Sequence, residues 1–396
     1  MDGASAAVGV AAAVLLYCCA RLLLGDCRVA LVAAPASSLD GKSVRALVEA
    51  HCPSLADPKK ARLVPTPYLV GGVLQTVYCA YGALRRDKQS DIRYEREALA
   101  MSDGGTVSLD WYPGQCGDAA SEQPIAVLVP GVGGSAYEYH IRALARHLAA
   151  RTRAGVRVVV ANHRGSGRTP LTSARLYNAY DTRDVADVLG HVARRFPRAP
   201  MVGVGFSMGG NLLTRYMGDA GDRALLAAAA VISCPFDVEL AGRAMDRPGV
   251  LSDWLFHGQV VASLKRVLVR NREVLAAAGS GLDFDAIMRA TRLSEIDSLV
   301  TSKTYGFGSC WEYYRAASSG PWVASIRRPF LAINARNDPM APAAGIPTAA
   351  FAANPHTAAA LLRHGGHIGF YAGLPPRIWF LQPVAEFVDA ALASAR

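Results

Sequence analysis

One serine of the chain stands in a pattern typical of enzymes that use a serine side chain as a nucleophile. Residues 205–209 are Gly-Phe-Ser-Met-Gly, a G-x-S-x-G motif centred on Ser207. The apolar run Met201–Gly205 leads into the motif, and the helical run Leu212–Met217 follows it. Between a strand and a helix this motif forms a sharp turn that leaves the serine hydroxyl exposed at the helix N-terminus. We therefore predict that Ser207 is a nucleophile. The alternative interpretation is a glycine-rich turn without catalytic meaning.

A serine hydroxyl is a weak nucleophile until a base removes its proton, so the chain should also supply a histidine and an acid. In enzymes that carry this motif between a strand and a helix, the acid follows the serine along the chain and the histidine comes last. Asp338 follows the apolar run Phe330–Asn334, although an Asp-Pro pair alone would predict only a turn. His367 lies in Gly-Gly-His-Ile-Gly, where small neighbours free the imidazole to reach across the sheet edge. We prefer it to His364, which stands closer to the preceding apolar run and has glycines on its C-terminal side only.

Acyl transfer also needs backbone N–H donors for the negative oxygen of the tetrahedral intermediate. The first expected donor is the N–H of Met208, the residue after the nucleophile. The second is the N–H of Val132, in the glycine-rich loop 130–135 that follows the apolar run Ile125–Val129. Such a loop could also cradle a phosphate, but it has neither the G-x-G-x-x-G pattern nor a Lys-Ser/Thr ending.

Short apolar runs alternate with longer amphipathic ones, which predicts an α/β fold with a mostly parallel sheet and helices on both faces. The expected strands are Ile125–Val129, Val156–Ala161, Met201–Gly205, Ala229–Ser233, Phe330–Asn334 and Ala358–Leu362, and the expected helices include His140–Arg153, Asp181–Arg195 and Phe380–Leu392. Active sites of such sheets assemble at the C-terminal ends of the strands. In the loop after residue 161, we expect Arg164 to organise the loop and assign no catalytic role to His163.

A long segment, residues 236–325, interrupts this rhythm and predicts a helical cap over a pocket. Helical periodicity is clearest around Trp254–Leu275. Its apolar residues Trp254, Leu255 and Phe256 could line an acyl channel or simply pack in a core.

The N-terminus contains an apolar segment. Gly3–Ala20 has no charged residue, and the apolar run continues after Arg21 through Leu24. Its length approaches the roughly 20 residues that a membrane-spanning helix needs. We predict a single-pass membrane anchor over residues 1–25, followed by a linker over 26–64 that could pack on the edge of the domain. The alternatives are a cleaved signal peptide, which Asp2 and the length of the run disfavour, and a buried helix. The positive charges follow the segment, which places the catalytic part on the cytoplasmic side.

Composition excludes several classes of protein. The 396 residues are 51% hydrophobic. This share suits a large core rather than a disordered chain. The eight cysteines are scattered without metal-ligand spacing, so we expect neither a metal nor a disulfide framework, and we expect no cofactor. Lys and Arg number 42 against 32 Asp and Glu, but without a basic run interleaved with aromatic residues, so nucleic acid is not an expected partner. The oligomeric state is undetermined.

Several ordered motifs together resemble the YheT-like branch of the α/β-hydrolase superfamily, which includes the α/β-hydrolase-domain proteins of types one, two and three. The similarity spans about Pro65–Val388. It covers Gly72–Val77 (H-L-Q-T in the branch), Tyr94–Trp111 (R-E and D-G…L-D-W), Asn162–Gly167 (N-x-R-G-x-G), Phe206–Tyr216 (F-S-M-G-G-N-L-L…Y), Tyr313–Ser318 (Y-Y-x-x-A-S) and Gly365–Phe370 (G-G-H-x-G-F). Two positions depart from the branch, because Val73 replaces its histidine and Pro130 replaces the histidine before the oxyanion loop.

The resemblance implies an α/β-hydrolase domain over residues 65–396 with Ser207, Asp338 and His367 as its charge-relay triad. It also implies lipid esters as substrates: monoacylglycerols, medium-chain acyl esters or phospholipids. The leading expectation is therefore a membrane-anchored serine esterase or lipase. The alternatives are an alcohol O-acyltransferase, since an alcohol can intercept an acyl-enzyme, and a catalytically inactive scaffold. No histidine has Asp five positions later, so the H-x-x-x-x-D acyltransferase signature is missing.

Overall fold

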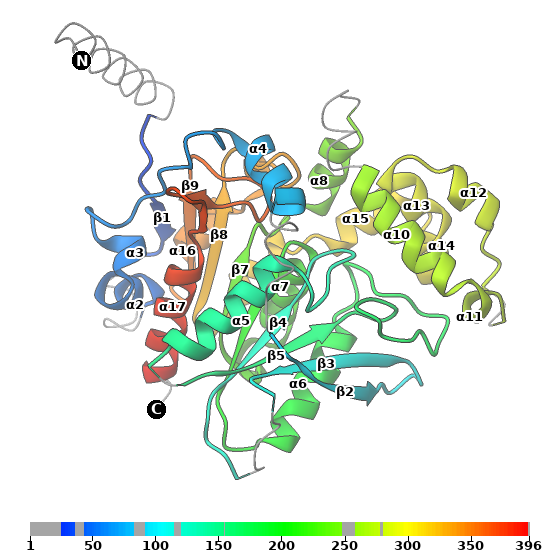
Figure 1. Cartoon of the computed structure of the whole chain (residues 1–396), viewed down its shortest axis with the longest axis horizontal. Coiled ribbons are helices and arrows are strands. Elements are labelled where there is room, and N and C mark those ends of the chain that lie inside the picture. The colour runs from blue at the N-terminus through cyan, green and yellow to red at the C-terminus, as the bar shows by residue number, and fades with distance from the viewer. Residues whose placement is uncertain are drawn as a thin grey trace, which may run out of the picture.

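The computed structural model describes residues 25–35, 43–82, 92–114, 120–153, 155–247, 258–277 and 280–394. A nine-stranded sheet in the order β1-β9-β8-β7-β6-β4-β5-β3-β2 runs through this part of the chain (Figure 1). Its strands are β1 (Ala30–Ala33), β2 (Glu95–Ala100), β3 (Thr106–Tyr112), β4 (Ile125–Val129), β5 (Arg157–Asn162), β6 (Met201–Phe206), β7 (Leu226–Ile232), β8 (Phe330–Ala335) and β9 (Thr357–Leu362). Strands β4–β9 are parallel to one another, whereas β1, β2 and β3 are antiparallel to their neighbours.

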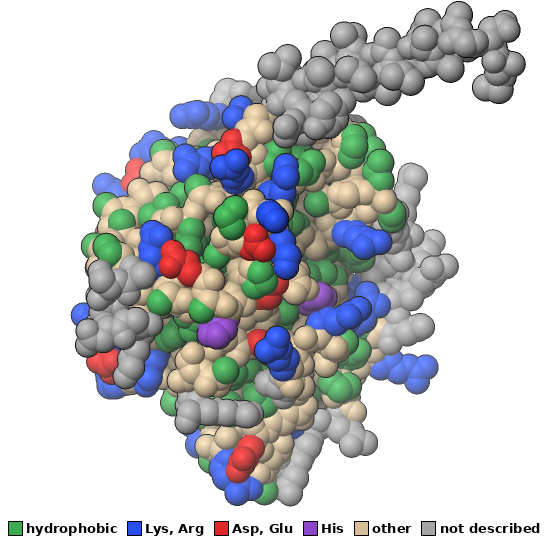
Figure 2. Space-filling model, turned by 90° about the vertical axis from the view of Figure 1, so that its left-hand side faces the viewer, with side chains coloured by type: hydrophobic (Ala, Val, Ile, Leu, Met, Phe, Trp, Pro, Cys, Tyr) green, Lys and Arg blue, Asp and Glu red, His purple; other side chains and the backbone are tan. Residues whose placement is uncertain are grey.

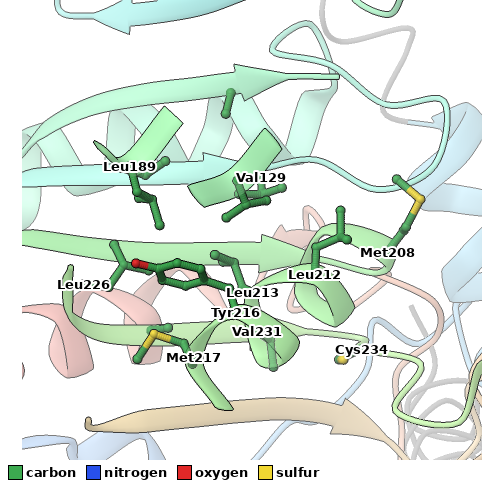
Figure 3. Packing of buried hydrophobic residues seen from close by; sticks show 14 of the residues in the cluster. Val129, Leu189, Met208, Leu212, Leu213, Tyr216, Met217, Leu226, Val231 and Cys234 are labelled. Carbon is green, nitrogen blue, oxygen red and sulfur yellow. The ribbon is translucent and has the colours of Figure 1, made fainter. Parts of the chain in front are cut away.

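Helices cover both faces of the sheet. On one face lie α6 (Arg183–Arg195) and α7 (Met208–Ala220), and on the other α5 (Tyr139–Arg151) and α17 (Leu381–Ser394). Figure 3 shows how α7 packs: Leu212, Leu213 and Met217 lie among side chains that include Val129 of β4 and Leu226 and Val231 of β7. Because the central strands are buried on both faces, their sequences are continuous apolar runs.

The six strands expected from these runs are confirmed, with ends close to the expected ones, and so are the three helices. The antiparallel strands β2 and β3 were not predicted. In β3 the apolar residues Val107, Leu109 and Trp111 alternate with polar ones instead of forming a continuous run, and the register to β2 also pairs Arg96 with Asp110. Residues 26–64, expected as a linker against the edge of the domain, contain β1, which pairs with β9 at the sheet edge, and α2 (Val44–His51) and α3 (Pro53–Ala56), which pack against α17. On this side of the molecule, basic side chains are interspersed with acidic and apolar ones (Figure 2).

The expected cap segment, residues 236–325, lies between β7 and β8 and is helical over much of its described part. It contains α8 (Val238–Met245), α10 (Gly258–Arg270), α11 (Arg272–Ala277), α12 (Phe284–Arg289), α13 (Leu293–Leu299), α14 (Thr301–Tyr305) and α15 (Cys310–Ala317). Residues of α10–α13 form their own apolar cluster. In Figure 1 these helices project to one side of the sheet. The expected channel residues 254–256 lie outside the described part of the chain.

Residues 1–24 of the expected membrane anchor also lie outside the described part. Among the residues described, no helix combines the length and the apolar character needed to cross a bilayer.

Candidate active site

Ser207 occupies a strained turn between β6 and α7. Its backbone has φ 50° and ψ −120°, a conformation that non-glycine residues rarely adopt. The turn is possible because its neighbours are glycines: a Cβ atom at Gly209 would lie 2.2 Å from the backbone oxygen of Val129, and one at Gly205 would lie 2.6 Å from the backbone oxygen of Gly209. The Ser207 N–H donates to the Ile232 carbonyl at 2.9 Å. Strain held in place by surrounding structure is a feature of functional sites.

The structure brings together the three side chains predicted to form the triad. His367 Nε2 lies 2.7 Å from Ser207 Oγ, and His367 Nδ1 lies 3.0 Å from Asp338 Oδ2 and 3.2 Å from Oδ1. All three residues are buried. Since an ionised carboxylate only accepts hydrogen bonds, Nδ1 carries the proton toward Asp338 and Nε2 is free to accept from the serine hydroxyl.

Asp338 does two things in its loop after β8. Its Oδ1 accepts the N–H groups of Met340 and Ala341 at 2.8 and 2.9 Å, which fixes the carboxylate, and both oxygens face His367. The Asp-Pro turn that was the competing interpretation is therefore compatible with the contact to His367.

The loop that carries His367 is held by a distant segment, α4 (Gly72–Val77). Thr76 Oγ1 accepts the N–H of His367 at 2.8 Å, and a Cβ at Gly366 would lie 2.4 Å from the carbonyl oxygen of Gly72. Gln75, fully buried, donates to the Tyr371 carbonyl and accepts the Tyr371 N–H. Sequence reasoning noted this segment only as a motif, since nothing local indicated its partner.

The glycine-rich loop 130–134 lies directly against Ser207. A Cβ at Gly131 would be 3.2 Å from Ser207 Cβ, and the expected oxyanion donors Val132 and Met208 line a cavity together with Ser207. The structure therefore places both residues beside Ser207.

Two aromatic rings fix that loop. His163 Nε2 lies 2.9 Å from the carbonyl oxygen of Pro130, and the Tyr177 hydroxyl accepts the Gly133 N–H at 3.0 Å. The His163 and Tyr177 rings stack with centroids 4.8 Å apart. Because a carbonyl only accepts, Nε2 carries the proton, and burial lowers the pKa of His163, so the ring stays neutral. His163 thus touches the loop rather than the nucleophile.

The expectation for Arg164 is confirmed. Its buried guanidinium makes a bidentate pair with Asp184 at 2.6 and 2.7 Å and reaches Asp103 at 2.9 Å. Neighbouring Asn162 accepts the Ala136 N–H at 2.8 Å, which ties the end of β5 to the start of α5. The end of β5 therefore organises the loops around it.

Two cavities meet at Ser207 and His367, and both include Val132 and Met340 in their walls. The cap chamber, of about 110 Å³, extends under the cap and has a mostly aliphatic wall that includes Met245, Leu264 and Leu293. The second chamber, of about 220 Å³, lies between α4 and the start of α5 and includes Glu138, His140 and Gln259. An ester bond positioned at Ser207 would thus have space on both sides.

His140 is the least satisfied of these groups. Its ring packs on Phe206, its buried Nε2 has no hydrogen-bond partner among the described residues, and burial lowers its pKa to about 3, which keeps it neutral. In the part of the chain that the structure describes, no group of three His, Cys, Asp or Glu side chains is placed to hold a metal ion.

Comparison with known proteins identifies the class to which this site belongs. The family model described as α/β hydrolase fold matches residues 124–374. The chain belongs to the α/β hydrolase family.

Within that family the relatives place the chain in the α/β-hydrolase-domain-containing branch. It is 31% identical to human (Homo sapiens) phospholipase ABHD3 over 340 residues, 85% of this chain and 79% of that protein. It is 27% identical to the yeast (Saccharomyces cerevisiae) medium-chain fatty acid ethyl ester synthase/esterase 2, covering 85% and 87%, and 26% identical to zebrafish (Danio rerio) monoacylglycerol lipase ABHD2, covering 86% and 79%. A Pyrococcus furiosus esterase shares the fold, with TM-score 0.50 and 14% identity over 76% of this chain and 92% of that one.

Proposed function

We propose that the protein is a serine hydrolase of lipid carboxylic esters that works through an acyl-Ser207 intermediate. The observation that carries the proposal is the continuous hydrogen-bonded chain from Ser207 Oγ through His367 to Asp338. The three named relatives, a phospholipase, an ester synthase/esterase and a monoacylglycerol lipase, support lipid esters as the substrate class.

In the proposed reaction Ser207 Oγ attacks the ester carbonyl carbon while its proton passes to His367 Nε2. Asp338 stabilises the resulting imidazolium through Nδ1. The N–H groups of Met208 and Val132 donate to the oxyanion of the tetrahedral intermediate. His367 then protonates the leaving alkoxide, so that the alcohol departs and the acyl group stays on Ser207. Water repeats the sequence and releases the carboxylic acid.

The two chambers suggest how the substrate is divided. The cap chamber, with its mostly aliphatic wall, suits the acyl chain. The second chamber suits the alcohol part, because Glu138, His140 and Gln259 offer hydrogen-bonding groups. In this arrangement the walls of the cap chamber determine the preferred acyl-chain length, and the walls of the second chamber determine the preferred head group.

The test is labelling of the purified full-length chain with a fluorophosphonate, together with hydrolysis of p-nitrophenyl esters of increasing acyl length. We expect labelling and turnover in the wild type and neither in Ser207→Ala. Adding ethanol as a competing acceptor separates hydrolysis from alcohol acylation by the ratio of acid to ethyl ester formed. A folded wild type that neither labels nor turns over any ester would refute the proposal and favour the inactive scaffold.

A further inference from the structure

The cap chamber contains one charged group that the proposed reaction does not use. Asp297, on α13, is the single acidic side chain among the described residues that line this chamber, and no described Lys or Arg lines it. Its position is unusual because most of the wall is aliphatic, and a carboxylate in such surroundings loses hydration unless other groups replace it.

The protein supplies Asp297 with only part of the hydrogen bonding that a carboxylate accepts. Thr301 Oγ1 donates to Oδ1 at 2.6 Å, and the buried Tyr314 hydroxyl donates to Oδ2 at 2.7 Å. Two carboxylate oxygens have about four acceptor sites, so roughly half of them stay open. No ion pair of Asp297 is found among the described residues, and the charge that acts on its pKa is the like charge of Asp246.

These two donors also fix the direction of the carboxylate. Thr301 begins α14 and Tyr314 lies on α15, so three cap helices converge on Asp297 and hold it in the chamber wall. Thr301 and Tyr314 line the same chamber. The result is a preorganised acceptor in the space that leads to Ser207 and His367. A preorganised acceptor costs little to order when a ligand donor arrives.

We infer that Asp297 forms a polar subsite within the cap chamber, and that the acyl groups preferred by this protein carry a hydroxyl that donates to its carboxylate. This inference rests on the proposed function, in which the cap chamber holds the acyl chain. A plain alkyl chain would leave the carboxylate without its missing donors, whereas a hydroxyl would supply one. Hydrogen bonds to charged groups are stronger than those between neutral groups, so the preference should be measurable.

The experiment compares p-nitrophenyl esters of linear acids of four to ten carbons with their ω-hydroxy counterparts, using the purified full-length chain. At one or more chain lengths we expect kcat/KM of the wild type to favour the hydroxylated ester by about tenfold or more. In Asp297→Leu the preference should reverse, because the plain chain gains an apolar wall. Asp297→Asn keeps the shape and a neutral acceptor, so its preference should be intermediate. This variant decides the matter if the leucine variant does not fold.

Glu295→Gln is the matched control, since it removes a carboxylate from the same helix at a position outside the chamber wall. It should leave the substrate preference unchanged. A wild type that favours the plain ester, or is indifferent, at every length would overturn the inference, and so would a preference that persists in both Asp297 variants.

Failure of the proposed function would look different, because the wild type would then neither react with the fluorophosphonate nor hydrolyse any ester. In that case the subsite is tested by calorimetry, which compares the binding of 1,8-octanediol with that of 1-octanol. Tighter binding of the diol that is lost in Asp297→Leu would support it, and equal binding of the two alcohols would refute it.

Discussion

His163 offers a direct test of how the loop beside the nucleophile is held. Its Nε2 donates to the Pro130 carbonyl at 2.9 Å, and the Tyr177 hydroxyl accepts the Gly133 N–H at 3.0 Å. These two hydrogen bonds flank Val132, whose N–H is a proposed oxyanion donor. Replacing His163 by Leu should release one flank of the loop. His163→Gln should retain it, because the glutamine amide nitrogen can take the place of Nε2.

The magnitude follows from the contacts that are lost. Removing the His163 donor leaves a buried Pro130 carbonyl unsatisfied, which should lower the free energy of unfolding by about 1–3 kcal/mol. Deleting an oxyanion donor outright costs about 100–1,000-fold in kcat. Because His163 acts on Val132 only through the loop, and Tyr177 still holds the other flank, we expect a smaller loss. A loss of about tenfold corresponds to ~1.4 kcal/mol of transition-state stabilisation.

The assay combines steady-state hydrolysis of p-nitrophenyl butyrate with inhibition by a trifluoromethyl ketone of similar chain length. The ketone forms a tetrahedral adduct with the serine and places negative charge where the oxyanion develops, so its affinity reports on the donors. In His163→Leu we expect kcat and ketone affinity to fall together, with little change in KM. In His163→Gln both should stay near the wild-type values. Thermal unfolding of each variant provides the measure of folding.

The reasoning would be refuted if His163→Leu lost stability while keeping both kcat and ketone affinity. His163 would then contribute to packing but not to the position of the loop. A rise in KM with kcat unchanged would also contradict it, because that pattern indicates a loss of ground-state binding.

Four further outcomes can be measured. Burial raises the pKa of Asp297 to about 6, above the ordinary value expected in the unfolded chain, so its ionisation costs native stability as pH rises between these values. Relative to the wild type, Asp297→Asn should therefore gain about 2 kcal/mol in stability between acidic and mildly alkaline pH, and a pH-independent difference in urea unfolding would contradict this. The Cβ of Gly209→Ala would meet backbone oxygen at 2.2 Å, whereas that of Gly190→Ala meets only the end of an arginine side chain. The first change should destabilise the fold by about 3 kcal/mol or more, and the second should not lower the urea midpoint. Thr76→Val removes the acceptor for the histidine N–H and should lower kcat, while Thr76→Ser should preserve it. Arg164→Met removes the bidentate partner of Asp184 and one partner of Asp103, which keeps its ion pair with Arg175 at 3.0 Å. It should cost about 1–3 kcal/mol in denaturant unfolding, and no measurable loss would show that Arg175 and water replace the guanidinium.

The central strands were predictable because burial on both faces forces a continuous apolar sequence. Strand β4, for example, is Ile-Ala-Val-Leu-Val with every residue buried. The outer strands β2 and β3 meet different demands. In β2, Arg96 pairs with Asp110, and Glu97 accepts from the Trp111 indole at 2.8 Å. In β3 the buried apolar residues Val107, Leu109 and Trp111 alternate with polar ones, a period-two signal that a search for continuous apolar runs does not detect.

The candidate site likewise has one part that could be predicted from the sequence and one part that could not. Ser207 was identifiable because its backbone strain requires glycines at fixed neighbouring positions, and that requirement is written within one short stretch of sequence. The support for His367 was not, because Thr76 and Gln75 lie far earlier in the chain. Short-range steric demands leave a local pattern, whereas a hydrogen bond across the fold leaves none in a single sequence.

The two departures from the family motifs can be understood from their contacts. At position 130, the backbone carbonyl accepts from His163, a contact that does not depend on the side chain, so the loop keeps this hydrogen bond with proline in place of histidine. At position 73, valine packs against the apolar pair Met245 and Met340, which join the cap to the loop after β8. Both methionines also line the cap chamber. An apolar side chain at position 73 therefore extends the aliphatic surroundings of that chamber, and the contrast with the single carboxylate of Asp297 becomes sharper as a result.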